Sequence, residues 1–181
     1  MAQSNFIEEP LLLDKECYFD QRGYFKETYR KEWFQEIDNS EFNQDNLSFS
    51  ISKGTLRGMH LQKHPFAQSK IVQCLQGKII DIVVDLRSES KNYTKYFKYE
   101  MEGKDNLILY VPQGFAHGFL TLEENTMVLY KVNNYYDPES EISISWNDPI
   151  LNLPWPMKEE DIILAKKDSE AISFNELDIK F

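Results

Sequence analysis

The chain has 181 residues, which is long enough for a single domain with a well-formed core, and we expect that domain to span residues 1–181. Its formal net charge of −10 disfavours nucleic acid and anionic membranes as partners, because both attract basic surfaces, so an anionic substrate would need a local basic pocket. The chain has two cysteines far apart, so we expect no disulfide framework. It has no apolar run of membrane-spanning length and no charged-then-apolar leader, so we expect a cytoplasmic protein.

The first part of the chain predicts short strands and one short helix. Residues 10–13 form an apolar run, which fits a strand at a sheet edge or a strand contributed to a partner subunit. A turn at 22–23 leads into an aromatic, strand-like segment, and 31–37 places apolar residues at the spacing of an amphipathic helix. Three amide or carboxylate side chains at 44–46 predict a turn before an alternating strand at 47–51.

The middle of the chain predicts a series of strands with hardly any helix between them. Many short strands with frequent turns are typical of a β-sandwich or barrel. Residues 158–168 predict one or two helical turns near the C-terminus. The strands are predicted at 71–75, 78–86, 93–101, 107–111, 119–122 and 127–132, and the segment 112–118 is predicted as a turn.

The stretch from 54 to 72 concentrates polar residues that could carry chemistry. In an unbent strand Arg57 and His60 would face opposite sides of the sheet, and a bulge near Gly58 would bring them together. A histidine is the natural proton acceptor near neutral pH, and a fixed ammonium inside a pocket, here that of Lys70, can stabilise an oxyanion. With Gln62, this group indicates a site for proton transfer, and a surface hairpin with incidental charge is the simpler alternative.

Two further segments bear on the same site. Tyr130 lies in an apolar strand and is either a core tyrosine with a bonded hydroxyl or a general acid. The segment 111–119, VPQGFAHGF, has the spacing of the second cupin motif, in which a tight turn aims His117 into a small barrel. Metal-binding cupins carry His-x-His and a following Glu in their first motif, whereas this chain has His60-Leu-Gln62. We therefore expect no metal.

A series of motifs from about Asp20 to Asp168 resembles the dTDP-4-dehydrorhamnose 3,5-epimerases, a family of metal-free cupins. In the family's order these motifs are DQRGYFKETY, QDNLSFS, GTLRGMHLQ, QSKIV, VDLR, VPQGFAHGF, LYKVNNYY, WNDP and LPWP. The resemblance implies an all-β, cupin-type double-stranded β-helix, or jelly-roll barrel, with a short N-terminal helix and a short C-terminal helical segment. It also implies an isomerase without a cofactor that acts on a dTDP-linked 4-keto-6-deoxy sugar in biosynthesis of the dTDP-L-rhamnose type.

The same resemblance assigns catalytic roles by motif position. His60 is expected to remove a proton next to the C4 ketone of the sugar, and Asp168 to orient the His60 imidazole. Tyr130 is the expected acid, and Lys70 is expected to stabilise the enolate. His117 is expected to line the sugar pocket.

The resemblance further implies a homodimer in which N-terminal strands cross over and some binding residues come from the neighbouring subunit. Ser69 replaces the family's usual glycine, and the turn at 88–96 also departs from the family pattern, without loss of a catalytic side chain. A C3-only epimerase, a ketoisomerase on a related dTDP- or GDP-sugar, and a non-enzymatic sugar-nucleotide-binding cupin are the alternatives. The expected substrate-binding positions, with Tyr135 stacking on the nucleotide, are Arg22, Glu27, Gln44, Asn46, Arg57, Gln62, His117, Tyr135, Glu141 and Lys167.

Overall fold

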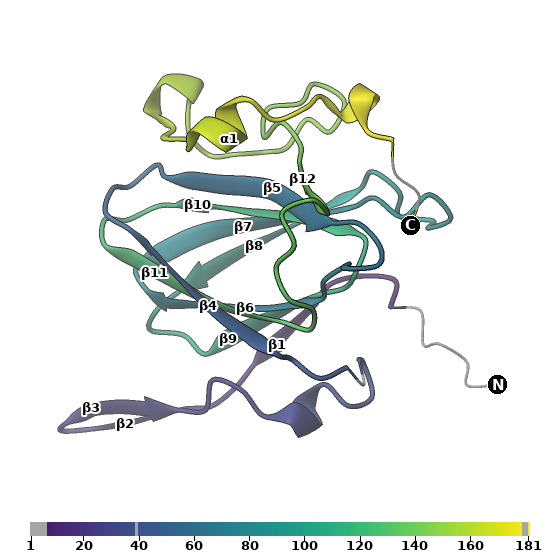
Figure 1. Cartoon of the computed structure of the whole chain (residues 1–181). Helices are drawn as coiled ribbons and strands as arrows, with labels where there is room; N and C mark the ends of the chain where they lie inside the picture. Colours follow the sequence, from purple (N-terminus) through teal and green to yellow (C-terminus); the bar gives the residue numbers. More distant parts are fainter. Residues whose placement is uncertain (1–6, 39, 179–180) are drawn as a thin grey trace.

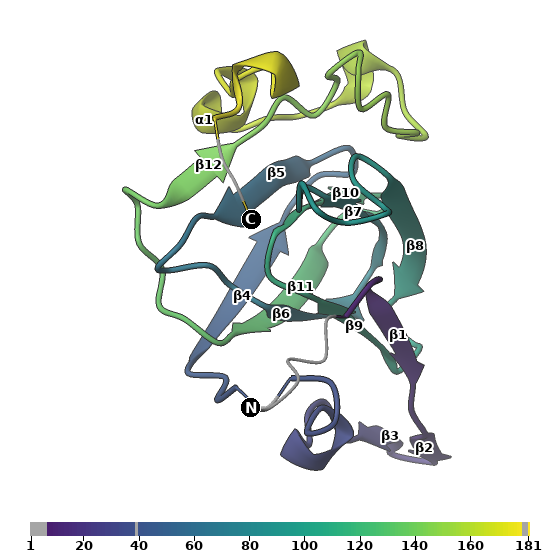
Figure 2. The same ribbon diagram turned by 90° about the vertical axis from the view of Figure 1, so that its right-hand side faces the viewer.

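Two five-stranded antiparallel sheets face one another in the computed structural model, which describes residues 7–38, 40–178 and 181 (Figure 1). Viewed from the side, they enclose a common interior, as predicted for an all-β jelly roll (Figure 2). The first sheet has the strand order β1 (Leu11–Asp14), β9 (Leu107–Val111), β6 (Lys70–Gln76), β11 (Thr126–Val132) and β4 (Gln44–Ser50). The second has the order β12 (Glu141–Ser143), β5 (Leu56–Gln62), β10 (Phe115–Thr121), β7 (Lys78–Asp85) and β8 (Tyr96–Glu102).

The inner faces of the sheets change from apolar to polar along their strands. Val72 and Val128 belong to the main core between the sheets, and Phe115 meets them from β10. Because side chains two residues apart share one face of a strand, Lys70, Tyr130 and His117 follow these core residues on the same inner faces. The apolar part holds the sheets together, since burying one such side chain contributes roughly 1.5–3 kcal/mol. The polar part is where a site can form.

The C-terminal segment forms a third layer over the outer face of the second sheet (Figure 1). Outward-facing Met59, Ile80 and Ile82 pack there against Ile144 and Leu151. The predicted helical turns are two separate pieces of this layer, the 3-10 helix η2 (Glu159–Asp161) and the helix α1 (Lys166–Ser169), and a further 3-10 helix, η3, spans Phe174–Glu176. This layer carries α1 to the edge of the barrel.

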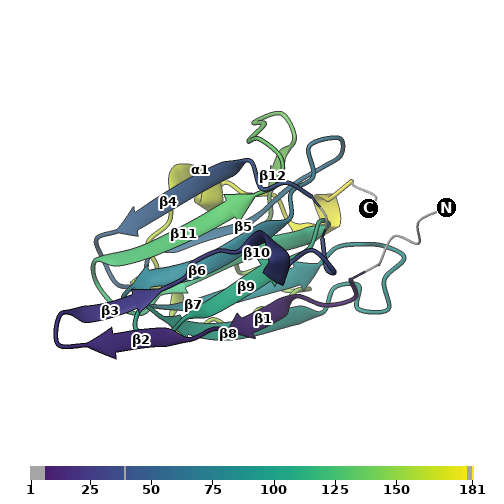
Figure 3. The same cartoon turned by 90° about the horizontal axis from the view of Figure 1, so that it is seen from below.

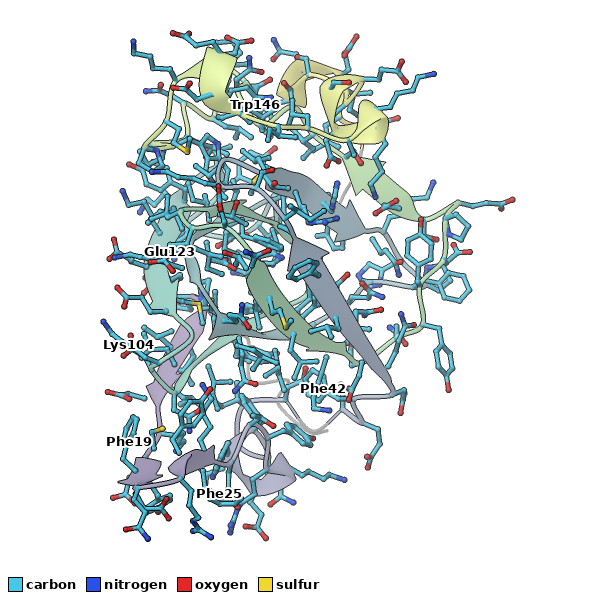
Figure 4. All side chains as sticks on the ribbon, turned by 90° about the vertical axis from the view of Figure 1, so that its left-hand side faces the viewer. Phe19, Phe25, Phe42, Lys104, Glu123 and Trp146 are labelled. Carbon is cyan, nitrogen blue, oxygen red and sulfur yellow. The ribbon has the colours of Figure 1, made fainter. Side chains whose placement is uncertain are left out.

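The N-terminal part lies against the first sheet and then leaves it. The run at 10–13 is confirmed as an edge strand, because β1 pairs with β9 of the same chain. The hairpin of β2 (Cys17–Asp20) and β3 (Gly23–Lys26), formed around the predicted turn, projects beyond the sheets (Figure 3). Figure 4 shows Phe19 and Phe25 on this hairpin, far from Trp146 in the C-terminal layer.

The helix predicted at 31–37 is wrong in extent, because only the 3-10 helix η1 (Lys31–Trp33) forms, followed by turns. Its N-cap residue, Arg30, makes no side-chain capping bond. A seven-residue α-helix without such a cap gains too few hydrogen bonds to offset the cost of nucleation. The apolar residues that suggested the helix are still used, since Phe34 is buried against Ile71 and Tyr110 on the outer face of the first sheet.

Two predicted turns are also corrected. Residues 44–46 belong to β4, because its pairing with β11 extends to Val132↔Gln44. The Gln44 amide donates to the Asn46 side chain at 2.8 Å, so these polar groups bond along the strand rather than closing a turn. The turn at 112–118 is shorter than predicted, because β10 begins at Phe115, which pairs with Asp85.

Among the described residues, no helix is both long enough and apolar enough to cross a bilayer.

Candidate functional site

A cavity of about 380 Å³ opens between the polar ends of the two sheets and α1. Residues of the first sheet, the second sheet and the C-terminal segment all line it. The structure thus brings together most of the predicted site residues, namely His60, Tyr130, Asp168, Lys70, Gln44, Asn46, Arg57, Gln62, His117, Glu141 and Lys167.

A bulge in β5 places Arg57 and His60 on the same cavity, as predicted. The pairing of β5 with β10 matches His117 with His60 but Phe119 with Arg57, so β5 contains one extra residue between the pairs. Gly58 makes this possible, because its φ of +136° disfavours other residues and a Cβ there would lie 2.5 Å from the Gly118 Cα. The local sequence therefore creates the site by bending the strand.

His60 is arranged as a proton acceptor. Its Nε2 lies 2.6 Å from Oδ1 of Asp168, which is buried on α1. An ionised Asp168 accepts the Nε2 proton, so Nδ1 is the nitrogen left to take a proton. Burial lowers the pKa of His60 below its ordinary value, against the opposing effect of Asp168. His60 is therefore neutral at physiological pH, as a base must be.

Lys70 lies at the start of β6, with its ammonium near the His60 carbonyl at 3.5 Å. Burial lowers the pKa of Lys70 to about 8, and the negative charges of Glu141 and Asp81 oppose this effect. Most of the Lys70 population is therefore cationic at neutral pH. The Ser69 amide just before it donates to Asn133 at 2.8 Å, so the residue that departs from the family's glycine is fixed by a buried bond.

Tyr130 enters the cavity from β11 of the first sheet, whereas His60 enters it from β5 of the second. Burial raises the pKa of Tyr130, which keeps its hydroxyl protonated at neutral pH. A proton donor and a proton acceptor therefore approach one cavity from opposing sheets.

His117 forms a second imidazole–carboxylate pair. Its Nε2 lies 2.8 Å from Oδ2 of Asp81, and both side chains are buried. His117 is a strand residue on β10 and not the tip of a tight turn, since the turn ends before Phe115. It lies directly across from His60 in the pairing of β10 with β5.

One side of the cavity has the groups expected for an anionic ligand. Arg57 is exposed there, and its guanidinium donates to the Phe49 carbonyl at 3.2 Å, beside the amides of Gln44 and Asn46 on β4. Guanidinium groups pair well with phosphate oxygens because their fork of donors matches two acceptors. This is the kind of local basic site that an anionic substrate of so acidic a chain would need.

Glu141 joins the second sheet to α1 at the cavity. Its Oε1 accepts from Lys167 at 2.9 Å, and its Oε2 accepts from the Tyr136 hydroxyl at 3.0 Å. Burial opposes ionisation of Glu141, but the Lys167 bond and the positive neighbours outweigh it and lower the pKa. This ion pair and the contact of Asp168 with His60 both hold α1 against β5 and β12.

Three predicted site residues lie outside the cavity lining. The Arg22 side chain is 85% exposed on the hairpin, where it pairs with Asp20. Glu27 pairs with Arg30, beyond the hairpin. Tyr135 is 68% exposed and is a neighbour of the lining residue Tyr136.

Gln62 lines the cavity, but the described contacts of its amide serve the surrounding loops. Its Nε2 donates to the carbonyls of Phe66 and Tyr135, and its Oε1 accepts from the Asp137 amide at 2.9 Å. The structure therefore gives Gln62 a role in holding the loops around the cavity.

Sequence reasoning missed several contributors to the site, among them Tyr136, Ser48 and Asp81. Tyr136 follows a predicted residue, and Ser48 has the same strand parity as Asn46, so strand alternation from a correctly placed β4 would have found it. Asp81 had a clearer signal, since a carboxylate inside an otherwise apolar strand is rarely buried without a partner.

Among the described residues, no group of three or more His, Cys, Asp and Glu side chains is arranged to hold a metal ion. The absence of a metal from the reaction stays a prediction from the sequence.

Comparisons with known proteins point to one group of enzymes. The family model described as dTDP-4-dehydrorhamnose 3,5-epimerase matches residues 5–176. A relative of that name from Sinorhizobium fredii is 40% identical over 180 residues, which cover 99% of this chain and 92% of the relative.

Solved structures of similar proteins contain nucleotide-linked sugars. A 3,5-epimerase from Legionella pneumophila in complex with dTDP-4-keto-L-rhamnose has a TM-score of 0.89 and 36% identity, covering 96% of this chain and 92% of that chain. A 3'-monoepimerase from Streptomyces bikiniensis in complex with dTDP-quinovose has a TM-score of 0.84 and 29% identity, covering 91% of this chain and 83% of that chain.

Proposed function

The chain belongs to the dTDP-4-dehydrorhamnose 3,5-epimerase family, and from this premise we propose how its cavity performs the reaction. The protein is an isomerase that inverts a dTDP-linked 4-keto-6-deoxy sugar at C3 and C5, in rhamnose biosynthesis. The residue roles that follow are proposals, and one observation carries them: His60 and Tyr130 line the same cavity from opposing sheets.

The proposed first step is removal of a proton from the carbon next to the C4 ketone. Nδ1 of neutral His60 takes the proton, and the electrons of the broken C–H bond move into the carbonyl to give an enolate. The Lys70 ammonium stabilises the negative oxygen as it develops, an interaction that is strong in a cavity of low dielectric. Asp168 holds the His60 ring through Nε2 and stabilises the imidazolium that forms.

In the second step Tyr130 donates its hydroxyl proton to the same carbon from the other face. The enolate electrons form the new C–H bond, the ketone returns, and the configuration is inverted. Solvent then takes the proton from His60 and restores that of Tyr130, so one proton leaves and one enters for each inversion. The same pair acts at C3 and at C5, because both carbons adjoin the C4 ketone.

The nucleotide is proposed to occupy the side of the cavity formed by Arg57 and β4. Its diphosphate would pair with the Arg57 guanidinium, and the amides of Gln44 and Asn46 would bind polar groups nearby. Tyr135, exposed beside the cavity, would stack on the base. Glu141 and Lys167 would complete the binding site next to α1.

We propose that the working protein is a homodimer in which each hairpin reaches the partner's cavity. Arg22 and Glu27, expected in the site, lie outside the cavity lining of their own chain. The hairpin also exposes Phe19 and Phe25, each 68% exposed, next to the exposed rings of Tyr18 and Tyr24, and a contiguous exposed apolar patch of this kind marks an interaction site. A second chain would cover these rings and receive the two polar residues.

The cytoplasm is the proposed location, since Cys17 and Cys74 are both free thiols in the described structure, as is usual in reducing compartments. A single domain over 1–181 also stays a proposal, and its first six residues lie outside the described part of the chain.

The direct test is incubation of the protein with a dTDP-linked 4-keto-6-deoxy sugar in heavy water, followed by proton magnetic resonance. We expect deuterium at C3 and C5 together with inversion at both carbons. Deuterium and inversion at C3 alone would instead identify a C3-only epimerase. No deuterium at either carbon would contradict enolate chemistry and leave a binding protein as the better account.

A further inference from the structure

The proposed mechanism does not use Asp81, although this residue is among the most deeply buried polar groups of the protein. It lies on the inner face of β7 between Ile79 and Val83, two members of the core, and is 0% exposed. Its Oδ2 contacts His117, and its Oδ1 has no hydrogen-bond partner among the described residues. A carboxylate in such surroundings is costly unless it is electrostatically compensated, so packing alone does not explain it.

The charged groups around Lys70 show which charge Asp81 compensates. Lys70 is buried and is attracted by Asp81 from β7 and by Glu141 from β12. Lys167 on α1 repels it, and the neighbouring His60 on β5 offers only its carbonyl at 3.5 Å. Glu141 has the larger effect on Lys70, but it also pairs with Lys167. Asp81 has no lysine or arginine partner among the described residues, and its side chain hydrogen-bonds to His117.

We propose that Asp81 is a positioning residue for the epimerisation, which fixes the ring of His117 and adds a buried counter-charge, alongside that of Glu141, that favours the cationic form of Lys70 beside the enolate. This inference rests on the proposed function of the cavity. An ionised Asp81 accepts the Nε2 proton of His117, which leaves Nδ1 as the nitrogen available to a sugar hydroxyl. The same negative charge favours the protonated form of Lys70.

Asp81→Asn keeps the shape of the side chain and removes its charge. Since a negative neighbour raises the pKa of an ammonium group, its loss lowers the pKa of Lys70 from about 8. The decline of kcat/KM at high pH, its basic limb, should then move down by about one pH unit, and activity at pH 8 should fall about fivefold. The affinity for dTDP should stay within about twofold, because Asp81 is not part of the proposed nucleotide site at Arg57 and β4.

Asp85→Asn is the matched control, because Asp85 is an equally buried carboxylate on β7 that pairs with Arg87 instead. The basic limb should keep its position in this variant. The proposal would be overturned if the basic limb of kcat/KM stayed in place in Asp81→Asn, or if it moved equally in both variants. Failure of the unmutated enzyme to exchange deuterium would count against the proposed function.

A second measurement does not depend on activity or on the folding of a variant. In the unmutated protein with ¹⁵N-labelled histidine, the ring nitrogens of His117 report which one carries the proton, and His117→Gln assigns the signals. At about pH 8 we expect a protonated Nε2 and an unprotonated Nδ1. A proton on Nδ1 with none on Nε2 would overturn the role of Asp81 even in a fully active enzyme.

Discussion

The roles proposed for His60 and Lys70 require opposite protonation states in one cavity, and burial lowers the pKa of both groups. The base must be neutral and the enolate-stabilising group must be charged. Burial favours the neutral form of each group, which helps His60 and works against Lys70. The ammonium starts from a much higher pKa, and the charges of Glu141 and Asp81 oppose the effect of burial, so Lys70 remains mostly charged after its pKa falls to about 8.

This arrangement predicts a bell-shaped pH dependence of kcat/KM. Activity should be lost as pH falls through the pKa of His60, which burial places below the ordinary value of about 6.5. It should also be lost as pH rises through about 8, where Lys70 gives up its proton. Initial rates across pH with the dTDP-linked substrate measure both limbs. An acid limb above about 7 would contradict a His60 base whose pKa is lowered by burial.

His60→Ala should separate catalysis from binding. Loss of the base should reduce both deuterium exchange and inversion by about 10²–10⁴-fold, whereas dTDP affinity should change little because the nucleotide lies elsewhere. Arg57→Ala is the complementary control and should weaken dTDP binding by removing a charge-assisted contact. A folded His60→Ala protein with more than about a hundredth of the original activity would remove His60 as the base.

At the scale of elements, the bulge in β5 is what turns a strand into a site. It sets Arg57 and His60 on one cavity, and it depends on the close approach of Gly58 to Gly118. The short helix α1 is the second such element, because it delivers Asp168 to His60 from outside the two sheets.

Gly58→Ala should therefore lose both stability and activity. A Cβ at this position would meet the Gly118 backbone at 2.5 Å, so β5 must move away from β10. We expect a loss of about 3 kcal/mol or more in the free energy of unfolding, measured by denaturant titration. Gly23→Ala is the control, since its φ of +131° is also unfavourable but no atom lies within 4 Å of the added Cβ. It should cost only about 1 kcal/mol. Equal losses would mean that the close approach is unimportant.

The sequence predicted most of these elements and the site, and its errors have physical causes. Strand alternation located most of the strands of the two sheets, and the parity argument located the bulge at Gly58. Local polarity misled at 44–46, where pairing with β11 outweighs turn propensity. The local sequence also could not identify Asp81 as the partner of His117, because the pairing of β7 with β10 is what brings the two side chains together.

At the scale of the whole molecule, the proposed mechanism places the two sheets on opposite faces of the sugar. The first contributes Lys70 and Tyr130, and the second contributes His60 and His117. The hairpin lies outside this arrangement, so Arg22 on the hairpin and Glu27 just after it fit the proposal of a second chain.

Mixing two inactive variants tests whether each site is formed by residues of two subunits. In a homodimer with exchanged hairpins, Arg22→Ala and His60→Ala damage different halves of each site, so a mixed dimer contains one intact site. After subunit exchange at equal amounts, about a quarter of the sites should be intact, with activity to match. Each variant incubated alone is the control. No recovery in mixtures that light scattering shows to be dimeric would place Arg22 outside the partner's site.

The central claim, that acid and base act on opposite faces, is tested most directly by Tyr130→Phe. This variant keeps the ring and removes only the proposed donor of the second face. The readout is proton magnetic resonance of the dTDP-linked 4-keto sugar in heavy water, followed over time for the unmutated protein and the variant. We predict that deuterium exchange persists while inversion is largely lost, because His60 still forms the enolate and returns deuterium to the face it came from. Inversion at the unmutated rate would contradict the account, since another group would then be the acid.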